Sequence, residues 1–259
     1  MIGSEEGYMA PQLIRLFAVF AMLACAPLAQ EHAGPHWSYR GAAGPSHWGE
    51  LDKDFAACQA GNQQSPIDIR APKPVDLPPI QVAYRPAPLH IINNGHTIQV
   101  NYEPGSSLTV GDRRYELKQF HFHHPSEEKI NGRSYAMVAH LVHAAADGSL
   151  AVVAVLLDAR GSANPLISSL WQHLPAHEGA EKTYGDVQLD VTGLLPADRG
   201  YYTFTGSLTT PPCTENVTWF VLKTPAPISQ RQADAFGRIY PRDARPTQPL
   251  NGRNVLMSQ

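Results

Sequence analysis

The sequence predicts a single, mainly β domain with few helices, covering residues 31–259. Its 23 prolines and 20 glycines divide the chain into short pieces throughout. Most pieces between residues 64 and 225 are rich in β-branched and aromatic side chains, which favour strands. No internal repeat, low-complexity tract or linker divides the chain after residue 30. One domain built on a sheet is therefore expected.

The individual elements are read from composition and capping residues. Asn164 and Pro165 supply a helix start before residue 173, and residues 229–240 place Ala233 and Phe236 on one helical stripe. Strand-like segments are residues 65–69, 91–92, 97–102, 107–110, 115–117, 119–124, 135–143, 150–157 and 218–222.

Composition favours a small-molecule substrate. The hydrophobic fraction of 43% is that of a globular protein with a sizeable core. The formal net charge of -3 is spread without long runs of one sign. Neither nucleic acid nor an anionic membrane is therefore an expected partner.

The first thirty residues resemble a secretory signal peptide, with approximate bounds 1–30. Arg15 precedes an apolar run over residues 16–24, and small residues follow at 25–29. The apolar run is about half the length of a membrane span, so the mature protein is expected to be exported, periplasmic or secreted, without a transmembrane segment. A disordered apolar N-terminus is the alternative. Cys25 also loosely resembles a lipoprotein cleavage site.

Export makes the cysteine count informative. Removing Cys25 leaves Cys58 and Cys213, an even pair in an oxidising compartment. A disulfide between them is expected, and two free buried thiols are the alternative.

Three histidines suggest a metal site. Residues 119–124 read as a strand that Pro125 ends, so His121 and His123 share one face. Residues 135–143 form the next strand, after a turn at Asn131-Gly132. His140 can then face the first two histidines, while His143 points to the opposite face as a buried structural residue. Three neutral imidazoles with a fourth position open suit zinc, or copper, nickel or iron. A chance or packing pair of histidines is the alternative.

Five further stretches occur around these histidines: residues 36–39 (HWSY), 64–69 (QSPIDI), 93–96 (NNGH), 206–219 (GSLTTPPCTENVTW) and 245–251 (RPTQPLN). Together with the histidine strands they closely resemble the alpha-class carbonic anhydrases, of the bacterial, exported type. The resemblance covers nearly the whole mature chain. It implies a large twisted, mostly antiparallel sheet with short surface helices, and a monomer or homodimer. The implied reaction is reversible hydration of carbon dioxide to bicarbonate and a proton by attack of zinc-bound hydroxide.

The resemblance also implies roles for single residues. His121, His123 and His140 match the Zn²⁺ ligands, Thr209 and Glu127 match the pair that orients the hydroxide, and His96 matches the proton shuttle. The remaining matches are Tyr39, Asn94 and Gln99 in the water network, Thr210, Val142, Val152, Leu208, Val217 and Trp219 at the substrate, and Cys58 and Cys213 as the disulfide.

Each role has a plainer alternative. Glu127 could be a solvated turn charge beside Glu128, and His96 could be an exposed turn residue without a role. The apolar residues assigned to the substrate could be ordinary core.

One position departs from the family. Val138 stands two residues before His140, where the family usually has a glutamate that accepts the ring N–H of the third ligand. Valine cannot accept a hydrogen bond, so weaker zinc retention is expected, or a substitute acceptor such as a backbone carbonyl or water.

Two rival functions remain open. His121-x-His123 followed by Glu127 also resembles the metal motif of cupins, in which the glutamate would bind iron or manganese. The second rival is a carbonic-anhydrase-like domain that has lost activity and binds a ligand or carries zinc. The presence of all three histidines, Thr209, Glu127 and His96 favours catalysis.

Overall fold

The computed structural model describes residues 1–3 and 36–259. Cys25 and all but the first three residues of the predicted signal peptide therefore lie outside the described residues. In the described part of the chain, no helix is long and apolar enough to span a membrane.

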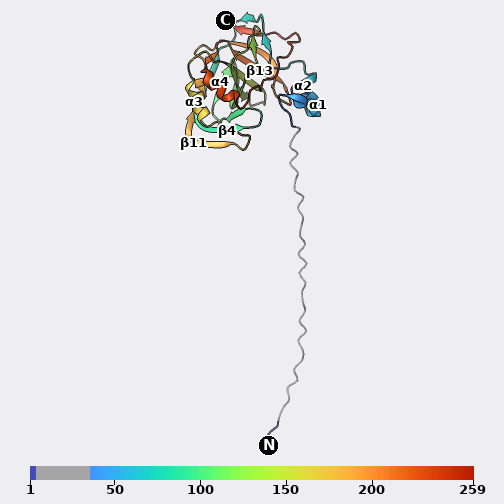
Figure 1. The fold of residues 1–259 in the computed structure, drawn as a ribbon, viewed down its shortest axis with the longest axis vertical. Helices are drawn as coiled ribbons and strands as arrows, with labels where there is room; N and C mark the ends of the chain where they lie inside the picture. The colour runs from blue at the N-terminus through green and yellow to red at the C-terminus, as the bar shows by residue number, and fades with distance from the viewer. Residues whose placement is uncertain (4–35) are drawn as a thin grey trace. The chain divides into compact units, whose positions relative to one another are not determined.

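A 13-stranded sheet forms the body of residues 36–259 (Figure 1), and two further strands form a separate sheet. The strands are β1 (Asp68–Ile69), β2 (Lys73–Val75), β3 (Ile80–Ala83), β4 (Ala87–Asn93), β5 (Ile98–Asn101), β6 (Ser107–Val110), β7 (Arg113–His123), β8 (Lys129–Ile130), β9 (Met137–Ala144), β10 (Leu150–Asp158), β11 (Lys182–Leu189), β12 (Tyr201–Ser207), β13 (Glu215–Leu222), β14 (Ala226–Pro227) and β15 (Leu256–Ser258). The helices are α1 (Trp48–Leu51), α2 (Ala57–Ala60), α3 (Pro165–Gln172) and α4 (Gln230–Gly237), with 3-10 turns at Gly41–Ala43, Lys53–Phe55 and Val191–Leu194.

The main path of the sheet runs β11-β4-β5-β7-β9-β10-β13-β12-β15-β2. Most neighbours along it are antiparallel, while the pairs β10–β13, β10–β14 and β15–β2 are parallel. The prediction of a mainly β fold on a large, mostly antiparallel sheet is confirmed.

The central strands bury both faces, and alternation divides their side chains between two apolar clusters. Along β10, Val153 and Val155 belong to the larger cluster, which α3 and α4 cover with residues such as Ile167 and Phe236. Val152 and the alternate residues after it face the smaller cluster on the other side. On β9, Ala139 and Leu141 belong to the larger cluster, so the side chain of His140 between them points to the second side. The sheet therefore separates the helix-covered core from the face that carries the histidines.

The two predicted longer helices begin where their caps place them. The Asn164 side chain accepts the backbone N–H groups of Leu166 and Ile167, and Pro165 occupies the first turn of α3. Ser229 and Gln232 form a capping box at the start of α4. Both helices bury apolar residues, and in α4 these include Ala233 and Phe236 of the predicted stripe.

Cys58 and Cys213 form a disulfide. The predicted pairing is confirmed, and the alternative of two free thiols is wrong. The bond joins α2 to the loop between β12 and β13, and the two half-cystines pack beside Trp48.

Candidate functional site

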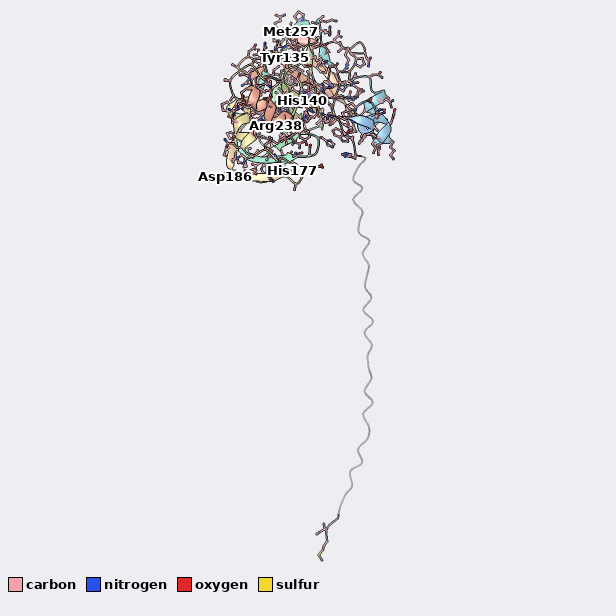
Figure 2. The ribbon with its side chains drawn as sticks, in the orientation of Figure 1. Tyr135, His140, His177, Asp186, Arg238 and Met257 are labelled. Atoms are coloured by element: carbon pink, nitrogen blue, oxygen red, sulfur yellow. A yellow bond between two sulfur atoms is a disulfide. The ribbon has the colours of Figure 1, made fainter. Side chains whose placement is uncertain are left out.

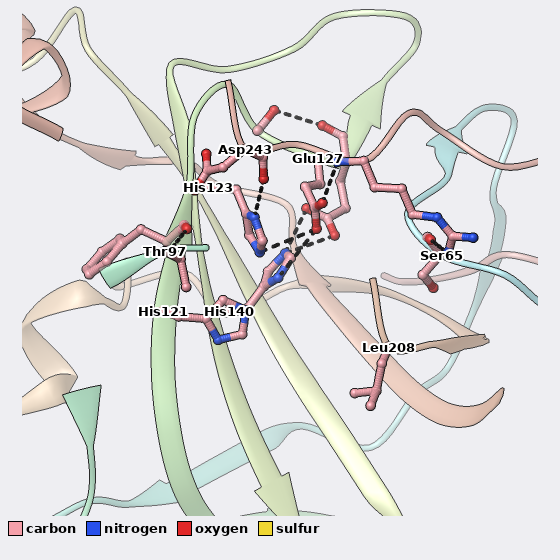
Figure 3. Close-up of polar contacts among 12 residues, drawn as sticks. Ser65, Thr97, His121, His123, Glu127, His140, Leu208 and Asp243 are labelled. Atoms are coloured by element: carbon pink, nitrogen blue, oxygen red, sulfur yellow. Dashed lines mark hydrogen bonds and ion pairs between the residues drawn. The ribbon is translucent and has the colours of Figure 1, made fainter. Parts of the chain in front are cut away.

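Three imidazole rings meet where β7 and β9 lie side by side. His121 and His140 are direct partners in the antiparallel register, and His123 follows two residues along the same face of β7. One ring nitrogen from each of the three lies within 4.8 Å of the other two. Figure 3 shows the rings turned toward one another. His123 and His140 are buried and His121 is half-buried, so the site is open on the His121 side.

The second nitrogen of each ring is held by an acceptor. Nδ1 of His121 lies 2.8 Å from Gln119 Oε1, and Nδ1 of His123 lies 2.7 Å from the backbone carbonyl oxygen of Asp243. Nε2 of His140 lies 3.1 Å and 3.2 Å from the two carboxylate oxygens of Glu128. Each contact assigns that nitrogen as the N–H donor, which leaves the other nitrogen of each ring as a free lone pair.

The free lone pairs fit a metal ion. They belong to Nε2 of His121, Nε2 of His123 and Nδ1 of His140, and Nε2 of His123 is buried without a hydrogen-bond partner among the described residues. Burial, together with the neighbouring imidazoles, lowers the pKa of both His121 and His123. Neutral rings are the form that binds metal. The three histidines can therefore hold a divalent cation.

Glu127 lies directly beside this cluster. Its Oε1 accepts the backbone N–H of Arg245 at 2.7 Å, and its Oε2 lies 3.5 Å from Nε2 of His123 and 3.9 Å from Nδ1 of His140. Burial and the adjacent Glu128 carboxylate raise its pKa well above the usual range, against the lowering influence of the Arg245 backbone N–H and the nearby Thr209 hydroxyl. Only 2% of Glu127 is exposed, so the alternative of a solvated turn charge is wrong.

Glu127 does not join the ligand cluster. In the described part of the chain, the one group of side chains that could share an ion consists of His121, His123 and His140 alone. This arrangement argues against the cupin-like alternative, in which Glu127 would be a ligand.

Thr209 is buried in the loop between β12 and β13, close enough to Glu127 for its hydroxyl to lower the pKa of that carboxyl. The loop is tightly held. Leu208 N–H donates to the Thr214 carbonyl at 2.9 Å and Cys213 N–H donates to the Thr210 carbonyl at 2.8 Å. The disulfide then ties the loop to α2, so Thr209 and Thr210 have little freedom to move.

An apolar row lies next to His140. Val142, Val152 and Trp219 are register partners across β9, β10 and β13. Leu208 and Val217 belong to the same apolar cluster, and the Trp219 ring lies 5.0 Å from that of His140 between centroids. The structure thus brings together all five apolar residues assigned from the sequence, against one side of the histidine cluster.

His96 lies in the turn between β4 and β5. Its ring stacks on Trp37 with centroids 3.6 Å apart and planes 9° apart. Asn94 Oδ1 accepts the backbone N–H groups of His96 and Thr97, so Asn94 shapes this turn. Burial and the nearby His36 lower the pKa of His96, partly offset by Glu178. His96 is half-buried rather than freely exposed.

The other two residues assigned to a water network differ in setting. Gln99 is the register partner of His121 on the neighbouring strand β5, and its amide donates to Asn101 Oδ1 at 2.7 Å. The Tyr39 hydroxyl is buried and has no hydrogen-bond partner among the described residues.

Glu128 is a site residue that the sequence reasoning did not identify. It is fully buried and it accepts the hydrogen bond of His140 that Val138 cannot accept. The expected substitute acceptor therefore exists, but it is a side-chain carboxylate and not a backbone carbonyl or water. The available signal was the Glu127-Glu128 doublet combined with an apolar residue at position 138.

Arg245 is a second residue without an assigned role in the sequence reasoning. It is 2% exposed, and its guanidinium donates to Gln64 Oε1 and to the backbone carbonyls of Ser65 and Cys58, each at 2.8 Å. Its backbone N–H meanwhile fixes Glu127. Arg245 thus connects the N-terminal segments to the site. The site itself lies deep in the fold: Figure 2 shows His140 near the middle of the folded residues, and His177 and Asp186 at their periphery.

Comparisons with known proteins agree with this geometry. Residues 43–259 match the family model described as eukaryotic-type carbonic anhydrase. A carbonic anhydrase of Neisseria gonorrhoeae is 46% identical over 94% of this chain and 97% of its own, and one of Nostoc sp. is 45% identical over 85% of each chain. The solved alpha-carbonic anhydrase of Thermovibrio ammonificans, in complex with the inhibitor sulfanilamide, superimposes with a TM-score of 0.83 at 40% identity, covering 86% of this chain and 99% of the other. The chain therefore belongs to the alpha-class carbonic anhydrases, the enzymes that interconvert carbon dioxide and bicarbonate.

Proposed function

We propose that this protein hydrates carbon dioxide reversibly at a Zn²⁺ ion bound by His121, His123 and His140. The supporting observation is the set of three convergent lone pairs, each fixed by an acceptor on the other nitrogen of its ring. When bound in such a site, zinc acts as a Lewis acid that makes water a nucleophile near neutral pH. The protein supplies the orientation, the apolar surface and the route for the proton.

Thr209 and Glu127 orient the nucleophile in this proposal. Glu127 already accepts the Arg245 N–H, and its remaining oxygen faces the histidines. A threonine hydroxyl that donates to a carboxylate can only accept from its other neighbour. Thr209 therefore accepts the O–H of the attacking oxygen, and a lone pair of that oxygen points at the substrate carbon.

The apolar row beside His140 receives carbon dioxide. The substrate carries no charge, so a surface of Val142, Val152 and Trp219, with Leu208 and Val217 next to it, suits it better than a polar one. Thr210, the half-buried residue after Thr209, would contact the substrate from the polar side.

His96 accepts the proton that the site must lose in each cycle. A half-buried imidazole with a lowered pKa is neutral at pH 7 and can take up a proton and pass it to buffer. Tyr39, Asn94 and Gln99 line the intervening water route.

We also propose that the protein is exported, periplasmic or secreted. The predicted signal peptide supports this proposal, as does the Cys58–Cys213 disulfide, because such bonds persist in oxidising compartments.

Stopped-flow measurement of carbon dioxide hydration tests the proposal, alongside metal analysis of the purified protein. We expect zinc in a stoichiometric amount and hydration well above the buffer rate. The variant His140→Ala should lose both, and sulfanilamide should inhibit the wild-type protein. Zinc-loaded protein that hydrates carbon dioxide no faster than buffer would refute the proposal and favour the alternative of a binding module.

A further inference from the structure

The acceptor for His140 comes from outside its own strand. Alternation places Val138 on the same face of β9 as His140, but Val138 is an apolar residue packed in the smaller core cluster. Glu128 lies in the connection between β7 and β9, immediately before β8. A carboxylate has therefore reached the Nε2 side of His140 from a different backbone segment.

Glu128 is held in place on both sides. Its carbonyl accepts the Ser126 hydroxyl at 2.8 Å, and that same hydroxyl oxygen accepts the Tyr135 backbone N–H at 2.9 Å. The next residue, Lys129, donates its N–H to the Ile67 carbonyl at 3.2 Å and is paired with Asp68 in the small sheet β1–β8. The Glu128 side chain thus projects from a backbone segment that hydrogen bonds hold on both sides.

The His140 ring lies between two consecutive carboxylates. Its Nε2 is 3.1 Å from Glu128 Oε1, whereas its Nδ1 is 3.9 Å from Glu127 Oε2, beyond hydrogen-bond range. Both carboxylates are buried, so water does not compete for the ring N–H. The shorter contact selects the tautomer protonated at Nε2 and directs the Nδ1 lone pair toward His121 and His123.

We propose that Glu128 is the positioning residue of the metal site, taking over through His140 the task that Val138 cannot perform. This inference rests on the proposed zinc site. Glu128 does not contact the ion; it fixes the tautomer and the orientation of a ligand. The doublet Glu127-Glu128 then has two distinct tasks: Glu127 faces Thr209, and Glu128 faces His140.

The first test is zinc loss to a chelator at pH 7, followed for the wild-type protein, Glu128→Gln and Glu128→Ala. Removal of such an acceptor typically costs about 10 to 100-fold in metal affinity or activity, so zinc should leave Glu128→Ala about 10 to 100-fold faster. Glu128→Gln keeps an acceptor oxygen without the charge, so its rate of zinc loss should lie between those of the wild type and Glu128→Ala. Glu103→Gln, a change at an exposed carboxylate, is the matched control and should retain zinc like the wild type.

The second test is the imidazole N–H signal of His140 in the ¹⁵N-labelled, zinc-loaded protein. We expect the Nε2–H resonance of the wild type to be shifted far downfield by the carboxylate and to move upfield in Glu128→Gln. A general loss of stability would not move this one resonance in a folded protein. If Glu128→Ala does not fold, Glu128→Gln still provides both readouts.

The third test moves the carboxylate. In the double variant Val138→Glu/Glu128→Gln, the acceptor is transferred to the strand position that shares the face of His140, and slow zinc loss should return. Zinc loss as fast as in Glu128→Gln alone would contradict the assignment. So would unchanged zinc loss and an unchanged His140 resonance in both single variants.

These outcomes separate the two proposals. Zinc-loaded protein without hydration activity, but with faster zinc loss from the Glu128 variants, would refute the proposed function and support the positioning role. Full activity with zinc loss unaffected by Glu128 would do the reverse.

Discussion

His143 and His140 lie three residues apart on β9 and face opposite sides of the sheet. His140 faces the carboxylates and the other two imidazoles, whereas His143 is fully buried and its Nε2 lies 2.8 Å from the Tyr84 hydroxyl. Burial lowers the pKa of His143 to about 4. Strand parity alone predicted this separation, and the structure confirms that His143 stands apart from His121, His123 and His140.

The neutral, buried His143 should make the protein sensitive to acid. Its pKa of about 4 in the folded state lies below the value of about 6.5 in the unfolded chain, so the unfolded state binds more protons as the pH falls. The free energy of unfolding should therefore decrease between pH 6.5 and 4, by about 3 kcal/mol from this residue. Urea unfolding of the zinc-loaded protein across that range measures the loss.

The variant His143→Gln removes the titrating group, so its stability should depend less steeply on pH than that of the wild type. The exposed residue His177 provides the control, because His177→Gln should leave the slope unchanged. An equal slope in wild type and His143→Gln would show that this histidine takes up its proton in the folded state as readily as in the unfolded chain.

The lowered pKa of His96 predicts how turnover depends on pH. In the proposed cycle the neutral ring accepts the proton, and a pKa below 6.5 keeps it neutral to lower pH, so turnover limited by proton transfer should fall only below pH 6.5. His96→Ala should reduce turnover in dilute buffer on the order of 100-fold. Stopped-flow assays in dilute buffer check this, and added imidazole should restore the rate. Turnover that His96→Ala leaves unaltered would assign the shuttle elsewhere.

Glu128 marks the limit of prediction at the residue scale. Alternation along a strand gives the face of each neighbour, so the environments of His121, His123 and Val138 could be predicted. The connection between β7 and β9 has no such period. The direction of its side chains depends on the pairing of β8 with β1, a contact between segments about sixty residues apart in the sequence.

At the scale of elements, the predictable parts are those with a strong local signal. Capping residues predicted that α3 and α4 are helices and where they begin. Alternation predicted that β7 and β9 are strands and which face of each carries the histidines. Segment 65–69 yields only the two residues of β1, because Pro66 cannot donate to a sheet. The strand β11 was not predicted, since it is mostly exposed at the edge of the sheet and carries polar residues and Gly185.

The loop of Thr209 depends on anchors remote in sequence. Besides the disulfide, Gln64 Nε2 donates to the Cys213 carbonyl at 3.1 Å, and Ser65 and Ser207 exchange hydrogen bonds of 2.9 Å and 3.1 Å. Since these contacts join the loop to the segment after α2, loop position and folding of the N-terminal part are coupled.

Removing the disulfide should therefore reduce stability more than activity. The double variant Cys58→Ser/Cys213→Ser loses a cross-link over a sequence separation of 155 residues, and we expect about 2–5 kcal/mol less stability. The hydrogen bonds of Gln64 and Ser65 should still hold Thr209 near Glu127 at 25 °C. Urea unfolding and stopped-flow hydration on the same samples separate the two effects. A folded variant with lost activity would show that the disulfide itself sets the loop.

Among residues 36–259, the buried carboxylates and the buried guanidinium gather on one side of the sheet. Glu127, Glu128 and Asp243 are buried carboxylates, and Arg245 is the buried guanidinium among them. Burial raises the pKa of both Glu127 and Asp243 well above the usual range. A divalent cation at the histidines would offset this excess of acidic groups. The larger apolar core lies on the other face, covered by α3 and α4.

Metal removal should therefore lower the free energy of unfolding but leave the protein folded. At free zinc about 1,000-fold above its dissociation constant, binding adds roughly 4 kcal/mol to the free energy of unfolding, and chelation removes this amount. Far-UV circular dichroism of the metal-free protein should match that of the loaded protein, because the helix-covered core does not involve the ion. Hydrogen exchange should speed up locally, in β7 and β9, where the three histidines lose their common partner.

Thermal unfolding before and after chelation, with zinc added back, measures the effect. The Tm should fall on chelation and return with zinc, and His140→Ala should have a Tm close to that of the metal-free protein and respond little to zinc. Equal melting temperatures with and without metal would mean that the folded protein does not bind zinc in preference to the unfolded chain, and would count against a zinc site at the three histidines. Loss of the circular dichroism signal on chelation would instead mean that the ion is required by the entire sheet, and the independence of the two faces would be refuted.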